Sequence, residues 1–262
     1  MLYEKLDLIQ QVAPIIRESG SIVLSYFHQR IEWREKDGKG FVTQADLASE
    51  EYLIRMLKPL IPDASFFAEE SGKSNYGNDY CWVIDPLDGT TNFAHGLSYF
   101  CISVALTYKN ESVFGMIYQP LLQELFYAQK GKGAWLNDKK LKVSDLPFEK
   151  SVIGVGHSYA KGKERESLLK AVEQIAKQAY SIRHFGAAAL DIAQVAAGRL
   201  DGVLFSDLAW WDIAAGMVIL TESGGSISDF QGNPLGADYK SFIGVNTLAS
   251  HERLINLLKT AN

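Results

Sequence analysis

The sequence WVIDPLDGTTNF occupies residues 82–93 and carries most of the information about the fold. Its apolar start predicts a strand, which we expect to end at Asp85 because Pro86 fixes φ and has no N–H to donate. Asp88 follows three residues later, and Gly89 allows a tight backbone path. Two such charges 4 Å apart repel by about 4 kcal/mol at an effective dielectric of 20. A site that keeps both carboxylates ionised therefore needs a cation.

The chemistry of this stretch favours magnesium and phosphate. Carboxylates together with a backbone carbonyl suit a hard ion such as Mg²⁺ better than they suit zinc. Thr90 and Thr91 are placed to open a short helix, and a helix N-terminus binds anions through its N–H groups. An alternative without any ligand, an Asx-type turn followed by a helix cap, explains this stretch equally well when it is taken by itself.

Other acidic residues extend the metal-site hypothesis. Glu69 follows the apolar residues 65–68, and Asp212 follows two tryptophans at the expected start of a helix. The helix dipole alone favours an Asp in a first helical turn, so Asp212 has an explanation without a ligand. Asp46 also has one, because Thr43 and Asp46 fit a capping box with Thr43 as the N-cap. From the residues alone, the cap is the favoured interpretation of Asp46.

The composition is that of an ordinary soluble globular protein. The 262 residues are 47% hydrophobic and 22% charged, which excludes disorder, collagen and coiled coil. The net charge of −5 and the lack of a Lys/Arg cluster predict no direct nucleic-acid binding. We expect no membrane span and no signal peptide. Only two cysteines are present, Cys81 and Cys101, so a disulfide framework is excluded and a cytoplasmic location is compatible.

Hydrophobic periodicity predicts a sheet-rich first half and an alternating second half, with a boundary near residue 145. Pro14 predicts a kink or an early helix boundary, and Leu47, Ile54 and Leu57 are expected on one apolar helix face. Helices are expected near residues 6–27, 43–58, 164–178, 187–197, 212–222 and 251–259. Strands are expected near residues 65–68, 80–84, 100–108, 112–118, 124–129, 152–156, 182–185, 202–205 and 241–245.

Six segments carry a resemblance to a known family. They are FVTQAD, FFAEESG, WVIDPLDGTTNF, GAAALD, GRLDG and WWDIAAG, in this order along the chain. Together they resemble the inositol monophosphatase family of Mg²⁺-dependent phosphatases, over about residues 5–260. The resemblance implies an α/β fold, a layered α-β-α-β-α sandwich of the inositol monophosphatase and fructose-1,6-bisphosphatase type. It also implies an α+β first half and an α/β second half, which the boundary near residue 145 divides into domains 1–145 and 146–262, and it implies a homodimer.

The resemblance further implies a role for individual residues. Two or three Mg²⁺ ions would be held by the carboxylates of Glu69, Asp85, Asp88 and Asp212 and by the backbone oxygen of Leu87. Thr90 and Asp46 would orient the attacking water, so we expect a hydrogen bond between them. The substrate-binding residues would be Gly89, Thr90, Thr91, Gly186, Ala187, Ala188 and Asp212.

The chain departs from the family pattern at two positions. Gly40 stands where the family has an Asp, which weakens the third metal position unless Asp37 substitutes for it. Phe205 stands where many members have a Glu that binds substrate hydroxyls, with Asp207 two residues further on. Since a phenyl ring accepts no hydrogen bond of that kind, we predict relaxed substrate choice.

The activity expected from the resemblance is hydrolysis of inositol 1-phosphate and related small phosphomonoesters by metal-activated water. No Cys or His nucleophile accompanies the motif, so no phosphoenzyme is expected. One alternative is a sister activity on fructose 1,6-bisphosphate, NADP or histidinol phosphate. A second alternative, from a different class, is a binding role toward the transcription machinery, as in a bacterial relative.

Overall fold

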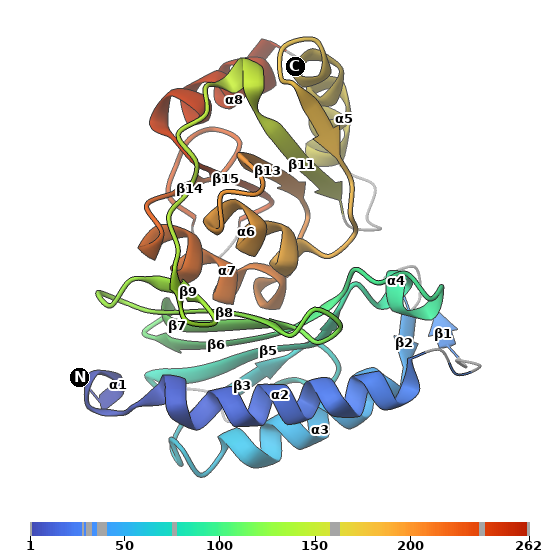
Figure 1. Cartoon of the computed structure of the whole chain (residues 1–262), viewed down its shortest axis with the longest axis vertical. Helices are drawn as coiled ribbons and strands as arrows, with labels where there is room; N and C mark the ends of the chain where they lie inside the picture. Colours follow the sequence, from blue (N-terminus) through green and yellow to red (C-terminus); the bar gives the residue numbers. More distant parts are fainter. Residues whose placement is uncertain are drawn as a thin grey trace.

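The chain is built from alternating layers of helix and sheet (Figure 1). The computed structural model describes residues 2–27, 29, 33–35, 41–74, 78–157, 163–235 and 239–260. An outer helix pair covers one face of an eight-stranded sheet, and a middle helix pair separates this sheet from a five-stranded one. A second outer helix pair covers the far face of the five-stranded sheet (Figure 1). The expected α/β fold, a layered α-β-α-β-α sandwich, is confirmed.

The first outer layer consists of α2 (Leu8–Tyr26) and α3 (Gln44–Leu57), with the short α1 (Leu2–Lys5) before them. α2 runs through Pro14, so the early boundary given as one of two alternatives is wrong, and the kink given as the other stays a prediction. Buried apolar residues lie on both sides of Pro14, and their packing against the sheet holds the helix together.

One face of α3 is buried and carries polar as well as apolar side chains. Its buried residues are Ala45, Asp46, Ser49, Glu50, Leu53 and Leu57. Leu47 is 46% exposed, so its expected place on the apolar face is wrong. Polar residues of this face reach the neighbouring strand β5, because the Ser49 hydroxyl donates to the Pro86 oxygen at 2.9 Å.

The eight-stranded sheet has the order β10-β9-β8-β7-β6-β5-β3-β4, in which only the β3–β5 pair is parallel. A separate two-stranded pair, β1 (Trp33–Glu35) with β2 (Phe41–Thr43), precedes α3. The strands of the large sheet are β3 (Ser65–Ala68), β4 (Gly72–Ser74), β5 (Tyr80–Asp88), β6 (Cys101–Tyr108), β7 (Glu111–Gln119), β8 (Glu124–Gln129), β9 (Ala134–Leu136) and β10 (Lys139–Lys140).

β5 does not end at Asp85 as expected but continues through Pro86 to Asp88. Its pairing with β6 shifts there, since Asp85 pairs with Ser103 and Asp88 with Cys101. β5 thus carries one extra residue, a β-bulge, and a bulge is a place where the missing N–H of proline is tolerated. The short helix α4 (Thr90–Ala94) follows directly.

The second half of the chain alternates between strand and helix. Its sheet has the order β12-β11-β13-β15-β14, with β11 parallel to β12 and β13. The strands are β11 (Val152–His157), β12 (Ser181–Arg183), β13 (Gly202–Ser206), β14 (Ser226–Ser228) and β15 (Ser241–Val245). The helices are η1 (Phe148–Lys150), α5 (Lys163–Ala176), α6 (Ala188–Ala196), α7 (Trp210–Glu222) and α8 (Leu248–Thr260).

The middle layer, α6 and α7, joins the two sheets through one buried apolar cluster. This cluster contains Val83 and Ile117 from the first sheet, Ile192 and Ile219 from the helices, and Phe242 from the second sheet. The boundary predicted near residue 145 falls in the connection between β10 and β11. The division into two domains stays a prediction. Among the described residues, no helix is both long and apolar enough to cross a membrane.

Candidate active site

Three carboxylates from two distant parts of the sequence converge where β5 meets α7. Asp85 and Asp88 lie at the end of β5, Asp212 lies in the first turn of α7, and one oxygen of each is within 4.8 Å of the others. α7 begins at Trp210, two residues before the start that the sequence predicts. Asp212 consequently sits at the third helical position, where its Oδ2 accepts a hydrogen bond from the Ala209 N–H at 2.7 Å.

The bulge in β5 sets the direction of the neighbouring groups. The Leu87 N–H donates to Asp85 Oδ1 at 3.0 Å, and the Thr90 hydroxyl donates to the Leu87 oxygen at 2.9 Å. A carbonyl oxygen has two lone pairs, so the predicted metal-binding role of Leu87 remains open to it. Gly89 has φ = +91°, and a Cβ there would lie 3.0 Å from the Tyr99 oxygen, so only glycine fits.

The carboxylate of Asp88 is bound by the N-terminus of α6. The Ala188 N–H donates to Asp88 Oδ1 at 3.2 Å, and the N–H groups of Ala189 and Leu190 donate to Oδ2 at 2.8 and 3.4 Å. This places a carboxylate where the helix dipole favours negative charge. The N–H of Ala188, a residue for which the family resemblance implies a substrate-binding role, is thus directed at Asp88. A substrate-binding role for Gly186, Ala187 and Ala188 stays a prediction.

Burial and mutual repulsion raise the pKa values of these carboxyls. The pKa of Asp85 is raised well above its usual value, first by burial and then by the charges of Glu69, Asp88 and Asp212. Burial raises the pKa of Asp88 to about 7, although the N–H donors from α6 lower it. In the absence of a metal, these groups therefore retain protons at a pH where exposed carboxyls have lost them.

We expect the metal-free protein to lose thermal stability as the pH rises from about 5.5 to 8. An unfolded Asp titrates near pH 3.9, whereas Asp85 and Asp88 titrate higher in the folded state. The folded state therefore binds more protons than the unfolded state in this range. The stabilisation is fully present below the pKa of an unfolded Asp, and it is lost as the pH rises through the pKa of the folded Asp. Melting temperatures measured in EDTA across this range test the expectation.

Two further measurements test whether this pH dependence of the melting temperature arises from the carboxylate cluster. Mg²⁺ should raise the melting temperature more at pH 8 than at pH 5.5, because the metal competes with the protons. The variant Asp85→Asn should show a flatter pH dependence in EDTA. A melting temperature in EDTA that stays constant or rises between pH 5.5 and 8 would contradict the expectation.

Thr90 and Asp46 lie beside this cluster and are hydrogen-bonded to each other. The Thr90 hydroxyl has Asp46 Oδ1 at 3.0 Å, and Asp46 Oδ2 accepts from the Thr43 N–H at 2.8 Å and the Thr43 hydroxyl at 2.6 Å. The expected capping box and the expected Thr90–Asp46 bond are both confirmed. Burial raises the pKa of Asp46 to about 6. A carboxyl with such a pKa is well matched to proton transfer near neutral pH.

Glu50 is a residue of this region that the sequence analysis missed. Its buried carboxylate accepts hydrogen bonds from the N–H groups of Glu70 and Ser71, both at 2.8 Å. It thereby fixes the turn after Glu69, whose own N–H donates to the Ile84 oxygen on β5 at 3.1 Å. Glu69 lies close enough to Asp46, Asp85 and Asp88 for its charge to raise the pKa of each. Glu50 lies four residues after Asp46 on the same helix face, which was the signal that could have identified it.

Phe205 lies in the apolar core, which corrects the expectation that it faces the substrate. The side chain is 2% exposed, and its ring centroid lies 6.1 Å from that of Phe242. Gly156 leaves room for it, since a Cβ there would lie 2.9 Å from the Phe205 ring. Asp207, half-buried after the end of β13, has φ = +55° and donates its N–H to the Lys240 oxygen at 2.7 Å. Relaxed substrate choice can therefore not be argued from Phe205.

We expect Phe205→Glu to destabilise the protein rather than to change its specificity. The change removes a packed ring and places a carboxyl in an apolar layer, which costs about 3 kcal/mol or more. For a chain of this size the melting temperature should fall by roughly 6 °C or more. Phe205→Leu, which keeps the site apolar, should cost clearly less. A stable Phe205→Glu variant with improved selectivity for inositol 1-phosphate would show that residue 205 reaches the substrate after all.

The two tryptophans before Asp212 and the buried cysteine on β6 mainly pack against other side chains. Trp211 packs edge-on against Phe67 at 5.0 Å, and Trp210 lies 6.1 Å from Tyr239. Cys101 is buried on β6, with its sulfur 3.6 Å from Asp88 Oδ2. The predictions for Asp37 and Gly40 lie outside the described residues.

The donor atoms fit a hard divalent cation. Carboxylate oxygens and a backbone carbonyl are the groups that Mg²⁺ or Ca²⁺ binds, whereas zinc and copper favour sulfur and imidazole. The nearby thiol does not change this conclusion, because burial raises the pKa of Cys101 well above its usual value and the neutral thiol is a poor ligand. A cation would also neutralise the repulsion between the buried Asp85 and Asp88 and the half-buried Asp212.

The layered fold together with this acidic site is typical of metal-dependent phosphatases. A model of the inositol monophosphatase family matches residues 5–262, and the chain belongs to that family. It is 40% identical over 209 residues to the Nus factor SuhB of Pseudomonas aeruginosa, which covers 78% of this chain and 77% of the relative. It is 36% identical over 220 residues to the inositol-1-monophosphatase of Mesorhizobium japonicum, covering 83% of both. The structure of the IMPase from Thermotoga maritima superposes with a TM-score of 0.89 at 31% identity, covering 98% of both chains.

Proposed function

We propose that this protein is a Mg²⁺-dependent phosphomonoesterase that hydrolyses inositol 1-phosphate and related small phosphomonoesters. The observation that carries the proposal is the carboxylate cluster of Asp85, Asp88 and Asp212 next to the hydrogen-bonded pair Thr90 and Asp46. A metal-dependent phosphatase without a covalent intermediate needs both parts, one to hold a cation against phosphate and one to direct a water. Family membership and the relatives named inositol-1-monophosphatase support the substrate class.

The proposed ligands of the metal are acidic side chains and one carbonyl. Glu69, Asp85, Asp88, Asp212 and the Leu87 oxygen would hold two or three Mg²⁺ ions. When bound, Mg²⁺ would stabilise charge on the phosphate and lower the pKa of water. Protein groups would complete the substrate site, namely Gly89, Thr90 and Thr91 at the first turn of α4 and Gly186, Ala187 and Ala188 before α6.

Thr90 and Asp46 would perform the proton chemistry. Thr90 has one hydroxyl hydrogen and two acceptors within 3.0 Å, the Leu87 oxygen and Asp46 Oδ1. When Thr90 donates to Asp46, its oxygen is free to accept a hydrogen bond from the attacking water. Asp46, held by Thr43 and with a pKa of about 6, can then take up the proton through Thr90. No covalent intermediate is required.

A phosphate-release panel with purified protein tests the proposal. The substrates are inositol 1-phosphate, 2-glycerophosphate, fructose 1,6-bisphosphate, NADP and histidinol phosphate, each with Mg²⁺ and with EDTA. We expect hydrolysis of the first two, dependent on Mg²⁺. Activity that is undiminished in EDTA would overturn the metal role. A preference of more than a hundredfold for one of the last three substrates would replace the proposed substrate by that sister activity.

A binding role toward the transcription machinery is the second candidate, because the relative in Pseudomonas aeruginosa is named a Nus factor. The two roles are separable, since binding to a protein partner does not require the metal site. Purified RNA polymerase and purified Nus factors, immobilised one at a time, provide the test. Saturable binding that survives Asp85→Asn would support this second role.

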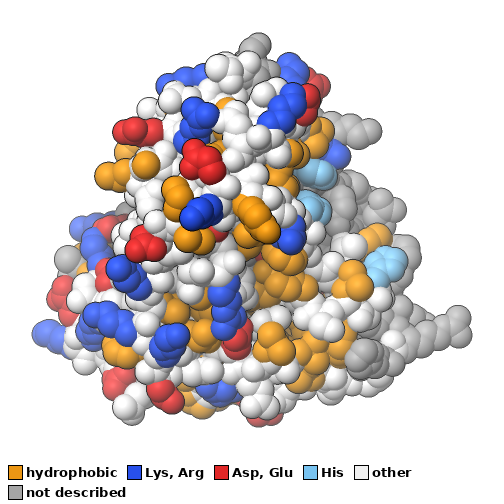
Figure 2. Space-filling model, turned by 45° about the horizontal axis from the view of Figure 1, so that its top comes forward, with side chains coloured by type: hydrophobic (Ala, Val, Ile, Leu, Met, Phe, Trp, Pro, Cys, Tyr) orange, Lys and Arg blue, Asp and Glu red, His pale blue; other side chains and the backbone are white. Residues whose placement is uncertain are grey.

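We further propose a cytoplasmic homodimer with two domains that divide near residue 145. On the face in Figure 2, Lys and Arg side chains are interspersed with Asp and Glu, and apolar side chains gather in the central region. Exposed apolar groups of this kind are typical of surfaces that associate. Light scattering across a concentration series tests the oligomeric state, and a monomer at micromolar concentration would contradict the homodimer.

A further inference from the structure

The middle helix α6 binds a predicted metal ligand, so its position bears directly on the proposed metal site. Three N–H groups of its first turn donate to Asp88 at 2.8 to 3.4 Å. Asp88 belongs to the first sheet, whereas α6 leads into β13 of the second sheet. A small shift of α6 along its axis would therefore move the donors away from Asp88.

Apolar packing against α7 and polar contacts at both ends hold α6 in place, since a Cβ at Gly216 of α7 would lie 2.7 Å from Ile192 Cγ2. Many of the side chains of α6 are small, as in its sequence AALDIAQVA. Contacts between apolar groups have no preferred direction, whereas hydrogen bonds do. Directional contacts at the two ends of α6 therefore add to this packing in setting the exact position of the helix.

At the N-terminal end, Tyr99 makes such a contact. Its hydroxyl donates to Asp191 Oδ1 at 2.6 Å, and Asp191 is 1% exposed in the first turn of α6. The Tyr99 ring stacks on Phe185, with 4.7 Å between centroids and 22° between planes. The side-chain amide of Asn92 donates to the backbone oxygens of Tyr99 and Phe185, both at 2.7 Å. Tyr99 is thereby connected to α4, to the segment before α6 and to α6 itself.

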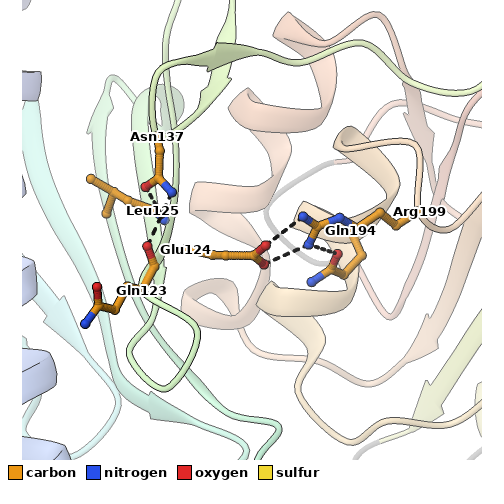
Figure 3. A network of polar contacts seen from close by, with 6 residues as sticks. All are labelled: Gln123, Glu124, Leu125, Asn137, Gln194 and Arg199. Carbon is orange, nitrogen blue, oxygen red and sulfur yellow. Dashed lines mark hydrogen bonds and ion pairs between the residues drawn. The ribbon is translucent and has the colours of Figure 1, made fainter.

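At the C-terminal end, an ion pair connects α6 with the first sheet (Figure 3). The Arg199 guanidinium donates to both oxygens of Glu124, at 2.6 and 2.7 Å, and to Gln194 at 3.1 Å. Glu124 lies at the start of β8, and Gln194 lies on α6. The nine residues of α6 span roughly 13 Å, so this contact lies about that far from the turn that binds Asp88.

We propose that the hydrogen bond between Tyr99 and Asp191 is a positioning contact that holds the first turn of α6 on Asp88 and so sets the affinity for the catalytic metal. Tyr99 and Asp191 act through Asp88 and not on the substrate. The inference rests on the proposed function for the identity of the metal, Mg²⁺. The ion pair at the other end of α6 contributes to stability without this effect.

Four variants separate positioning from stability. Tyr99→Phe removes the hydroxyl and keeps the stacked ring. Asp191→Asn keeps an oxygen that accepts the Tyr99 hydrogen bond. The double variant Tyr99→Phe with Asp191→Leu removes both polar partners, so no buried acid is left without its donor. Glu124→Gln weakens the contact at the other end of α6 and serves as the matched control.

Two quantities are measured for each variant: the melting temperature in EDTA, and the Mg²⁺ concentration that gives half of the metal-induced rise in melting temperature. Tyr99→Phe and the double variant should raise this concentration by about fivefold to tenfold, at or below the lower end of the range found when a direct hydrogen-bond partner of a metal ligand is lost. Asp191→Asn and Glu124→Gln should change it less than threefold. The double variant should regain part of the melting temperature lost in Tyr99→Phe, without regaining metal affinity.

Defined outcomes overturn the proposal. If Tyr99→Phe leaves the half-saturating Mg²⁺ concentration unchanged, or if the double variant recovers it together with stability, the contact is merely structural. If the double variant fails to fold, the comparison of Tyr99→Phe with Asp191→Asn decides, and equal Mg²⁺ affinities refute the proposal. A wild type that is stabilised by Mg²⁺ but hydrolyses no phosphomonoester would refute the proposed function and leave the positioning contact standing.

Discussion

Replacing Asp85 by asparagine should remove most of the phosphatase activity while leaving the metal-free fold at least as stable as the wild type. The change deletes one charge from a site where a bound cation would supply several kcal/mol to the transition state. We therefore expect kcat/KM to fall by roughly 10²- to 10³-fold at a fixed Mg²⁺ concentration. In EDTA the melting temperature should stay level or rise at pH 8, because Asp85 no longer adds to the buried repulsion with Asp88 and Asp212.

Asp201 provides a matched control for this experiment. It is an equally buried acid, 3% exposed, but its carboxylate accepts from the Val152 N–H at 2.7 Å and from the Ser144 hydroxyl, away from the cluster. Asp201→Asn should lower the melting temperature in EDTA and leave the Mg²⁺ dependence of activity unchanged. Full activity in Asp85→Asn would contradict this prediction. So would a loss of stability in EDTA like the one expected for Asp201→Asn, and either result would mean that Asp85 supports the fold rather than the metal.

The parts of the site that are local in sequence were predictable. Thr90 opens a short helix directly after Asp88 and Gly89, and the capping box joins Thr43 to Asp46, three positions later. Such features depend on φ preferences and on side-chain hydrogen bonds over a few residues, which a sequence states directly. The expected bond between Thr90 and Asp46, however, came from family resemblance, because the two residues are 44 positions apart.

The parts that depend on distant pairing were not predictable. Pro86 argues for the end of a strand, yet pairing with β6 accommodates it in a bulge. The donors that bind Asp88 come from residues about 100 positions later, and they are backbone N–H groups, which no side-chain pattern signals. Phe205 was placed at the substrate by its offset from Asp212, but its packing against Phe242 decides its position. In each case tertiary contacts outweigh the local preference.

The variant Thr90→Ala should slow turnover by roughly 10²-fold or more, with a much smaller change in KM. The change removes the Thr90 hydroxyl, which lies 3.0 Å from Asp46 Oδ1. It leaves untouched the carboxylate cluster that would hold the metal and the phosphate. An interaction used in the transition state but not in substrate binding is lost in kcat rather than in KM. Thr90→Ser, which keeps the hydroxyl, should retain activity to within a few-fold. Steady-state kinetics with inositol 1-phosphate at saturating Mg²⁺ measure both constants. A normal kcat with a raised KM in Thr90→Ala would mean that Thr90 binds substrate and takes no part in moving the proton to Asp46.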